Sequence, residues 1–156
     1  MIYVEALKEY TGNGPSIFLG GGITGTSDWQ TDIVGYLKYL VKPDLVVLNP
    51  RRKNFPIDDP TASFKQIEWE FNMLQKSSAI LFWFCKETLC PIVLYELGAH
   101  IKDQKPIFIG MDPEYQRRQD VEIQTKLVRD GVDIKYNLKE LALQVIQWNQ
   151  QLITTG

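Results

Sequence analysis

The residue types that most often bind transition metals are scarce in this sequence. Among its 156 residues are two cysteines, Cys85 and Cys90, and a single histidine, His100. The cysteine spacing is not Cys-x-x-Cys, and one histidine leaves a zinc ion short of ligands. We therefore expect no metal site and no cofactor, and we expect both cysteines to be reduced side chains packed in the interior.

Long apolar runs and an excess of basic residues are also missing. No run reaches the length of a membrane span, and the N-terminus lacks the residue order of a signal peptide. Lysine and arginine number 17 against 19 aspartates and glutamates, which gives a formal net charge of -2. A nucleic-acid-binding surface requires a basic excess. These absences favour a cytoplasmic protein that acts on a small molecule, with no nucleic-acid or membrane partner.

Short apolar segments alternate with amphipathic ones along the chain. The predicted strands are 16–19, 45–48, 79–84, 107–110 and a short one at 132–134. The predicted helices are 29–41, 64–76 (with Ile67, Phe71 and Leu74 on its buried face), 91–100, 120–129 and 138–152. Residues 1–15 are expected to form an edge strand or an N-terminal arm. The alternation predicts a single α/β domain over residues 1–156, with a parallel sheet flanked by helices on both faces.

The functional residues of such a sheet are expected where its strands end. In parallel α/β sheets the ligand lies beyond the carboxyl ends of the strands, and here loops 20–28, 49–63 and 85–90 are expected to meet there. The first loop begins with Gly20-Gly21-Gly22, which permits either close approach of a ligand or a tight turn. This loop does not match Gly-x-Gly-x-x-Gly, and no acidic residue ends the second strand, so a dinucleotide site is disfavoured.

Glu96 is the one carboxylate in an apolar helical segment, Leu94-Tyr95-Glu96-Leu97, that follows the apolar strand 79–84. A carboxylate without a partner is costly to bury, so Glu96 either faces water or acts in a partly dry site. Glu70, on the preceding helix, is either a second carboxylate of that site or a surface ion-pair partner. Paired carboxylates suit chemistry at an anomeric carbon, because one attacks the carbon while the other protonates the leaving group.

Three other residues expected at this edge have two interpretations each. Asp28 either caps the helix that starts at Trp29 or contacts the substrate. Arg51, like its neighbour Arg52, either binds a phosphate group or forms a structural ion pair. Trp29 either packs in the core or stacks on a nucleobase.

Several short segments together form a pattern that is specific for one protein family, although each segment alone is not. The segments are Phe18–Thr24, Asp28-Trp29, Asn49–Arg52, Gln66–Glu70, Phe82–Phe84, Glu87–Ile92, Leu94–Gly98, Gly110–Tyr115 and Gln124-Thr125. Over residues 16–145, this combination resembles the nucleoside 2-deoxyribosyltransferase-like family.

The resemblance implies a flavodoxin-like (Rossmann-like) three-layer sandwich with a five-stranded parallel sheet. It also implies transfer of a (deoxy)ribosyl group between nucleobases through a covalent glycosyl ester, an activity of purine and pyrimidine salvage. Glu96 falls on the family's nucleophile, and Glu70 falls where better-known members have an aspartate that contacts the sugar or the base. Two helpers of the nucleophile differ here: the tyrosine position is Phe18, and the aspartate that holds the deoxyribose hydroxyl is Cys90.

The predicted site therefore has two catalytic carboxylates, Glu70 and Glu96, and a set of substrate-binding residues. The substrate-binding residues are Gly20, Gly21, Gly22, Asp28, Trp29, Asn49, Arg51 and Cys90. The resemblance further implies a homo-oligomer, a dimer or larger, whose subunits complete one another's sites. Trp148, Leu152 and Ile153 either contribute to such an interface or pack the last helix on the core.

Two alternative functions are compatible with the same residues. The first is an N-glycoside hydrolase of nucleoside monophosphates, in which water replaces the acceptor base and Arg51 or Arg52 binds the phosphate. The second is a non-catalytic nucleotide-binding or sensing module, which Phe18 and Cys90 favour because they replace polar site residues. Exchange of one nucleobase for another separates a transferase from both alternatives.

Overall fold

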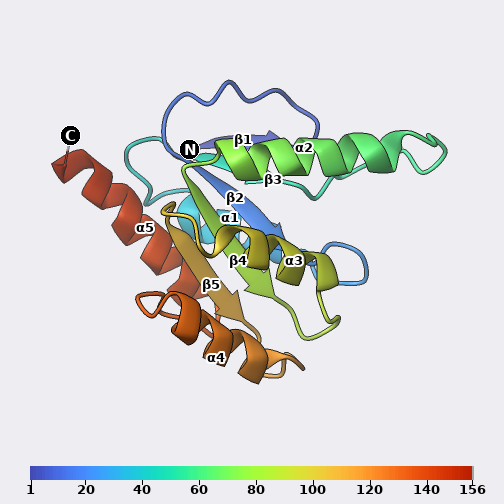
Figure 1. Cartoon of the computed structure of the whole chain (residues 1–156). Helices are drawn as coiled ribbons and strands as arrows, with labels where there is room; N and C mark the ends of the chain where they lie inside the picture. Colours follow the sequence, from blue (N-terminus) through green and yellow to red (C-terminus); the bar gives the residue numbers. More distant parts are fainter. Residues whose placement is uncertain (156) are drawn as a thin grey trace.

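Five parallel strands form one sheet in the computed structural model, which describes residues 1–155. The strands are β1 (Ile2–Glu5), β2 (Ser16–Gly21), β3 (Val46–Asn49), β4 (Ala79–Phe84) and β5 (Ile107–Met111). Their order across the sheet is β1-β3-β2-β4-β5, and every neighbouring pair is parallel (Figure 1). All six residues of β4 are buried, as expected for a central strand covered on both faces.

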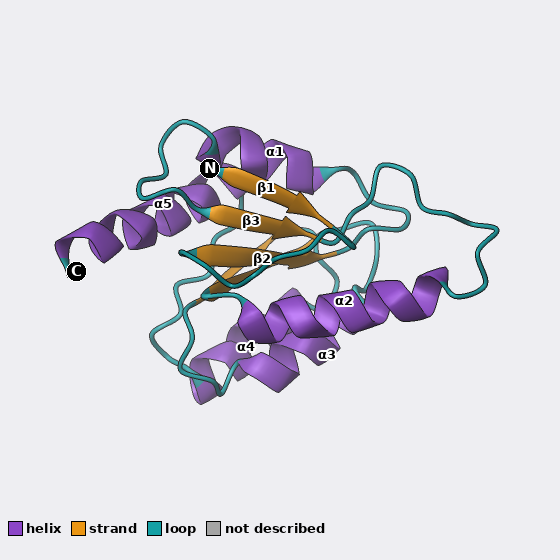
Figure 2. Cartoon of the chain, turned by 90° about the horizontal axis from the view of Figure 1, so that it is seen from above, coloured by secondary structure: helices purple, strands orange, loops and turns teal. Residues whose placement is uncertain are grey.

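Five helices cover the two faces of the sheet. They are α1 (Trp29–Leu37), α2 (Ala62–Lys76), α3 (Pro91–His100), α4 (Arg118–Val128) and α5 (Leu138–Thr154). Helices α1 and α5 lie on one face, and α2, α3 and α4 lie on the other (Figure 2). This arrangement confirms the predicted flavodoxin-like three-layer fold. Within residues 1–155, no helix is both long enough and apolar enough to cross a membrane.

The ends of the sheet differ in part from the expectation. Of the two arrangements expected for residues 1–15, the structure has the edge strand, β1, which pairs with β3 and is followed by a loop. The prediction of a short strand at 132–134 is wrong. Only a single bridge forms there, between Gly110 and Lys135, because the chain turns away after two backbone hydrogen bonds toward the start of α5.

Helix α2 buries a different face from the predicted one. Leu74 is buried, but Ile67 and Phe71 are 65% and 61% exposed. The indole of Trp69 packs against Phe18 of β2, with ring centroids 6.4 Å apart, and its Nε1 donates a hydrogen bond to the Lys8 carbonyl oxygen. This large side chain takes the core position and turns the Ile67 and Phe71 side chains toward solvent.

The end of β2 is held against α1 by a very close backbone approach. Trp29, 1% exposed, donates a hydrogen bond from Nε1 to the Gly22 carbonyl oxygen over 2.9 Å. A Cβ added to Gly21 would lie 2.2 Å from Cζ2 of this indole, which no real side chain tolerates. Glycine at position 21 therefore sets how closely α1 packs on the sheet.

Replacing this glycine tests the packing. Because the indole cannot move without disturbing the core, we expect Gly21→Ala to lower the free energy of unfolding by about 1–3 kcal/mol or more, as overpacked cores do. The matched control is Gly35→Ala in α1, where an added Cβ meets nothing within 4 Å. That variant should gain about 0.5–1 kcal/mol because alanine favours the helix. Urea unfolding of both variants measures the difference, and equal stabilities would contradict the packing argument.

Candidate active site

A cavity of about 280 Å³ opens between α2 and α3, beyond the carboxyl end of β2. Its wall is formed by Phe18 and the glycine loop, by Pro50 after β3, by Glu70 of α2, and by the segment from Thr88 to Glu96. These are the loops and helices that the parallel topology brings to one edge of the sheet. The cavity therefore lies where the sequence predicted a ligand site.

Two half-buried carboxylates face this cavity from neighbouring helices. Burial, and secondly the negative charge of Glu70, raise the pKa of Glu96 to about 8. Burial also raises the pKa of Glu70, against the opposing effect of a hydrogen bond from Gln66. Within residues 1–155, no hydrogen-bond donor or cation contacts the Glu96 carboxylate. The two groups thus share a partly dry site in which one of them holds a proton at neutral pH.

Gln66 positions Glu70 and was missed by the sequence analysis. Its Nε2 donates to Glu70 Oε1 over 2.7 Å and to the Pro50 carbonyl oxygen over 2.8 Å. These contacts tie α2 to the loop after β3 and orient the Glu70 carboxylate. The available signals were its place in the family-like segment Gln66–Glu70 and the spacing of four residues, which puts Gln66 and Glu70 on one side of a helix.

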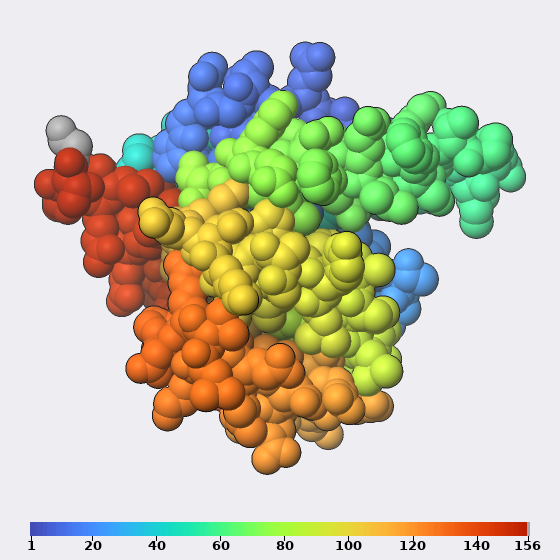
Figure 3. Space-filling model, viewed as in Figure 1, coloured from blue at the N-terminus to red at the C-terminus, as the bar shows by residue number. Residues whose placement is uncertain are grey.

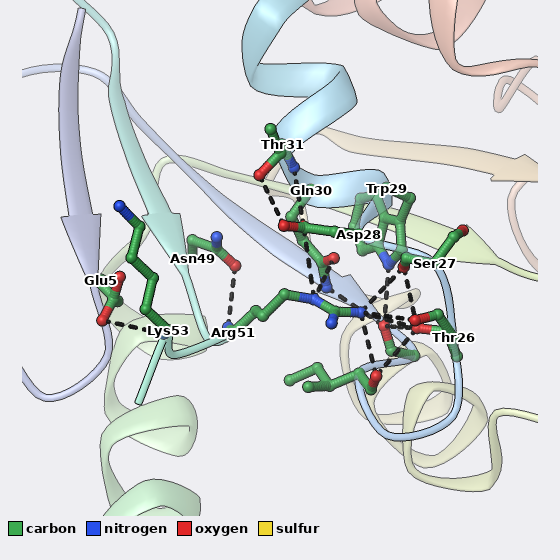
Figure 4. A network of polar contacts seen from close by, with 12 residues as sticks. Glu5, Thr26, Ser27, Asp28, Trp29, Gln30, Thr31, Asn49, Arg51 and Lys53 are labelled. Carbon is green, nitrogen blue, oxygen red and sulfur yellow. Dashed lines mark hydrogen bonds and ion pairs between the residues drawn. The ribbon is translucent and has the colours of Figure 1, made fainter. Parts of the chain in front are cut away.

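Arg51 lies at the centre of a polar network behind the glycine loop (Figure 4). Its Nε donates to Gln30 Oε1 over 2.8 Å, and its Nη2 donates to Thr26 Oγ1 over 2.8 Å and to the Ile23 carbonyl oxygen over 3.1 Å. Asp28, the cap of α1, lies 3.5 Å from Arg51 as its ion-pair partner. The guanidinium is therefore engaged in holding the 22–28 loop.

The other residues predicted at the site divide into two groups. Cys90 and the three glycines line the cavity, together with Glu70 and Glu96. Asp28, Trp29, Asn49 and Arg51 do not line it; they lie in or beside the loop network, where Asn49 Oδ1 accepts a hydrogen bond from the Arg51 backbone N–H over 2.9 Å. Among residues 1–155, no lysine, arginine or histidine side chain lines the cavity.

Cys90 and Thr88 form the part of the wall that precedes α3. Cys90 caps the helix with a left-handed backbone, φ 50°, and its N–H donates to Thr88 Oγ1 over 3.1 Å. Thr88 carries the one hydroxyl on this side of the cavity and was not among the predicted site residues. Its position in the loop 85–90 was the feature of the sequence that indicated a place at the site. In the described part of the chain, His, Cys, Asp and Glu side chains form no group of three that would hold a metal ion.

The fold and the cavity together define a flavodoxin-like α/β protein with paired carboxylates at the ligand-binding edge of the sheet. A family model described as "Nucleoside 2-deoxyribosyltransferase like" matches residues 14–115, a segment that includes every residue lining the cavity. The chain belongs to this family, which confirms the resemblance and supports a transferase with small nucleoside substrates. No curated protein matches the sequence.

The raised pKa of Glu96 makes stability depend on pH. Between the ordinary value of 4.5 and about 8, the folded protein holds a proton on Glu96 that the unfolded chain has released. Stability therefore falls as the pH rises through this window. From about pH 5 to about pH 9, we expect the wild type to lose on the order of a few kcal/mol more than Glu96→Gln, which cannot ionise.

Urea unfolding at several pH values measures this difference. The control is Glu68→Gln, which removes an exposed carboxylate from α2 and should keep the pH dependence of the wild type. Parallel stability curves for Glu96→Gln and the wild type would show that Glu96 ionises in the folded protein as it does in water.

Proposed function

We propose that the protein transfers a (deoxy)ribosyl group between nucleobases, with Glu96 as the nucleophile. The observation that carries this proposal is the pairing of Glu70 and Glu96 in one cavity of a member of this family. A role in purine and pyrimidine salvage and a cytoplasmic location are part of this proposal and stay predictions.

The proposed reaction has two displacement steps at C1′ of the sugar. In the first, a Glu96 carboxylate oxygen bonds to C1′ as the N-glycosidic bond breaks, and the leaving base takes a proton from Glu70. In the second, a nitrogen of the acceptor base bonds to C1′, the ester bond to Glu96 breaks, and Glu70 takes up the proton that this nitrogen loses. The enzyme then returns to its starting protonation state.

The proton held by the two carboxylates suits this scheme. The reactive form has Glu96 ionised and the proton on Glu70, and it differs from the resting form only in which carboxyl holds the proton. No net charge has to enter the partly dry cavity when the nucleophile is activated, because the total charge of the pair stays the same. Gln66 keeps Glu70 in place during both steps through its hydrogen bond.

The charge of the cavity favours nucleosides over nucleoside monophosphates. Two carboxylates line it, and among residues 1–155 no cationic side chain does. Arg51 is occupied by the 22–28 loop, so it is not free to bind a phosphate. A phosphate group in the cavity would meet like charges, which argues against the hydrolase of nucleoside monophosphates.

A non-catalytic nucleoside-binding module is the second candidate. It is favoured by the apolar Phe18 in the cavity wall and by the lack, within residues 1–155, of a hydrogen-bond donor to Glu96. A nucleophilic carboxylate usually has such donors to stabilise its charge. The two candidates differ in turnover, which one assay measures.

The assay incubates the protein with a deoxynucleoside and a second free base and follows the products by chromatography. We expect exchange of the bases, and we expect Glu96→Gln to lose at least about 10³-fold in rate, as loss of a nucleophile does. Glu70→Gln should lose about 10²–10⁴-fold, the usual contribution of an acid or base. Glu68→Gln, the exposed carboxylate on α2, is the control and should exchange bases like the wild type.

A 2-fluoro-deoxynucleoside should trap the intermediate as a sugar adduct on the peptide that contains Glu96, which mass spectrometry detects. Full activity of Glu96→Gln would contradict the nucleophile assignment. Release of free sugar without base exchange would make the protein a hydrolase, and binding without turnover would make it a binding module.

We also propose that the protein is a homo-oligomer. Exposed apolar side chains are present on both α2 and α3, whose green and yellow surfaces lie side by side in Figure 3. The exposed residues are Phe64, Ile67 and Phe71 of α2, and Ile92 and Tyr95 of α3. Ile92 also lines the cavity, so this apolar face reaches the cavity mouth. A patch of this kind is typical of a subunit interface.

The C-terminal residues Trp148, Leu152 and Ile153, which the sequence also suggested for an interface, do not all face solvent. Trp148 packs against Phe108, with ring centroids 5.8 Å apart, while Leu152 and Ile153 are exposed near the end of α5. The α2–α3 face is therefore the better candidate.

Sedimentation equilibrium tests the oligomer. We expect a mass at least twice that of the 18.0 kDa chain, and we expect Ile67→Asp to lower it because a charge in an apolar interface is unfavourable. The matched control is Ile123→Asp on α4, where isoleucine is also exposed. A monomeric wild type would contradict the proposal, and so would an equal effect of both substitutions.

A further inference from the structure

Two thiols touch beside the cavity, and one of them, that of Cys90, lines it. Cys85 follows β4 directly and Cys90 precedes α3, and their sulfur atoms are 3.5 Å apart. Both are buried free thiols, and the sequence contains no other cysteine. A disulfide has a sulfur–sulfur distance of about 2.05 Å, so an approach of about 1.5 Å would close one.

The segment between the two cysteines is a short surface turn. Lys86, Glu87 and Leu89 are exposed, and the segment contains no helix or strand. Cys90 has a left-handed backbone, which is unfavourable for a residue with a side chain. Because the Cys90 carbonyl oxygen accepts a hydrogen bond from the Leu94 N–H over 3.1 Å, a change in the turn that moves Cys90 also moves the start of α3.

The glycine loop, Gly20–Gly22, approaches both sulfurs closely at Gly22. A Cβ added to Gly22 would lie 3.0 Å from Cys85 Sγ and 3.6 Å from Cys90 Sγ. Cys90 itself lines the cavity, and it precedes Pro91, the first residue of the helix that carries Glu96. A change in the distance between the sulfurs is thus transmitted to two sides of the cavity.

We propose that Cys85 and Cys90 are a redox-sensitive pair, in which a peroxide closes a reversible disulfide that distorts the cavity and slows the reaction there. The formation of the disulfide stands on the contact between the thiols. Its effect on catalysis rests on the proposed function.

The chemistry assigns a different step to each thiol. Cys90 is reached through the cavity, so its sulfur bonds to one oxygen of hydrogen peroxide, the O–O bond breaks, and water leaves a sulfenic acid behind. The Cys85 sulfur then bonds to the Cys90 sulfur, the S–O bond breaks, and the hydroxyl leaves as water with the Cys85 proton. Two thiols and one peroxide give one disulfide and two waters. A small dithiol reverses the change by exchange.

The surroundings of Cys85 agree with its second place in this order. Burial, and then contact with Cys90, raise the pKa of Cys85 to about 11. Its thiol is therefore protonated at neutral pH and carries the proton that leaves with the hydroxyl as water in the second step.

Mass spectrometry of the whole protein tests the disulfide. After one equivalent of hydrogen peroxide, we expect a mass decrease of about 2 Da, loss of both alkylatable thiols, and recovery of both on addition of dithiothreitol. In the control variant Cys85→Ser, the one remaining thiol cannot close this bond, and its mass should rise by about 16 or 32 Da instead. Because the chain has two cysteines, an intrachain disulfide can only be this pair.

Two results would contradict the proposal that Cys85 and Cys90 form a disulfide with each other. One is sulfinic acid on the wild type with no species lighter by about 2 Da. The other is a disulfide that links two chains on a non-reducing gel. Neither result depends on whether the protein catalyses base exchange.

The effect on the cavity is measured separately. The base-exchange rate should fall in proportion to the disulfide fraction, by about 10²-fold when it is complete, because misplacement of reacting groups by about 1 Å costs that much. Dithiothreitol should restore the rate. If the disulfide forms fully and the base-exchange rate is unchanged, the proposal that the disulfide slows the reaction is wrong, and the proposed function is unaffected. Absence of exchange in both redox states would contradict the proposed function, while the mass shift would still decide the disulfide.

Discussion

The close contact between the end of β2 and the indole of Trp29 is the constraint on which the site depends. Because no side chain fits between Gly21 and this indole, the backbone of the glycine loop lies directly on α1. The Gly22 carbonyl oxygen then accepts hydrogen bonds from both Trp29 and Gln30. Gln30 in turn accepts from Arg51, which holds the rest of the loop. The wall of the cavity on the side of β2 is thus attached to α1, and α2 and α3 form the other walls.

Electrostatics divides the polar residues of this edge into two separate groups. Arg51 and Asp28 lie together behind the loop and neutralise one another. Glu70 and Glu96 lie together in the cavity, without a cation among residues 1–155, and their pKa values rise. Placing two carboxyl groups together in a partly dry cavity is unfavourable for folding, because ionisation of both is costly there, so the arrangement is one that stability alone would not select. It is the arrangement expected of a site that uses carboxylates for chemistry.

Much of the fold could be predicted because it follows from local patterns. The apolar run of β4 and the alternation of strands with amphipathic segments allow only a few topologies, and parallel strands direct the functional loops to one edge. Helix faces were harder to predict: the spacing favoured Ile67 and Phe71 as buried, whereas Trp69 occupies the core. Periodicity identifies a helix, but the side chain that fits the sheet beneath it selects which face is buried. The strand expected at 132–134 failed for a similar reason, because pairing needs a partner along its whole length.

The sequence by itself determined the fold class, the family pattern and the presence of an anomalous carboxylate, Glu96, since each depends on residue type and order. Only the tertiary structure decided which polar groups share the cavity, because side-chain direction depends on contacts between segments far apart in the chain. Glu70 reaches the cavity through the packing of α2 and its hydrogen bond from Gln66, while Arg51 is turned away by the loop it holds. The contact between Cys85 and Cys90 is likewise a product of folding, since it forms only when the turn after β4 leads back into α3.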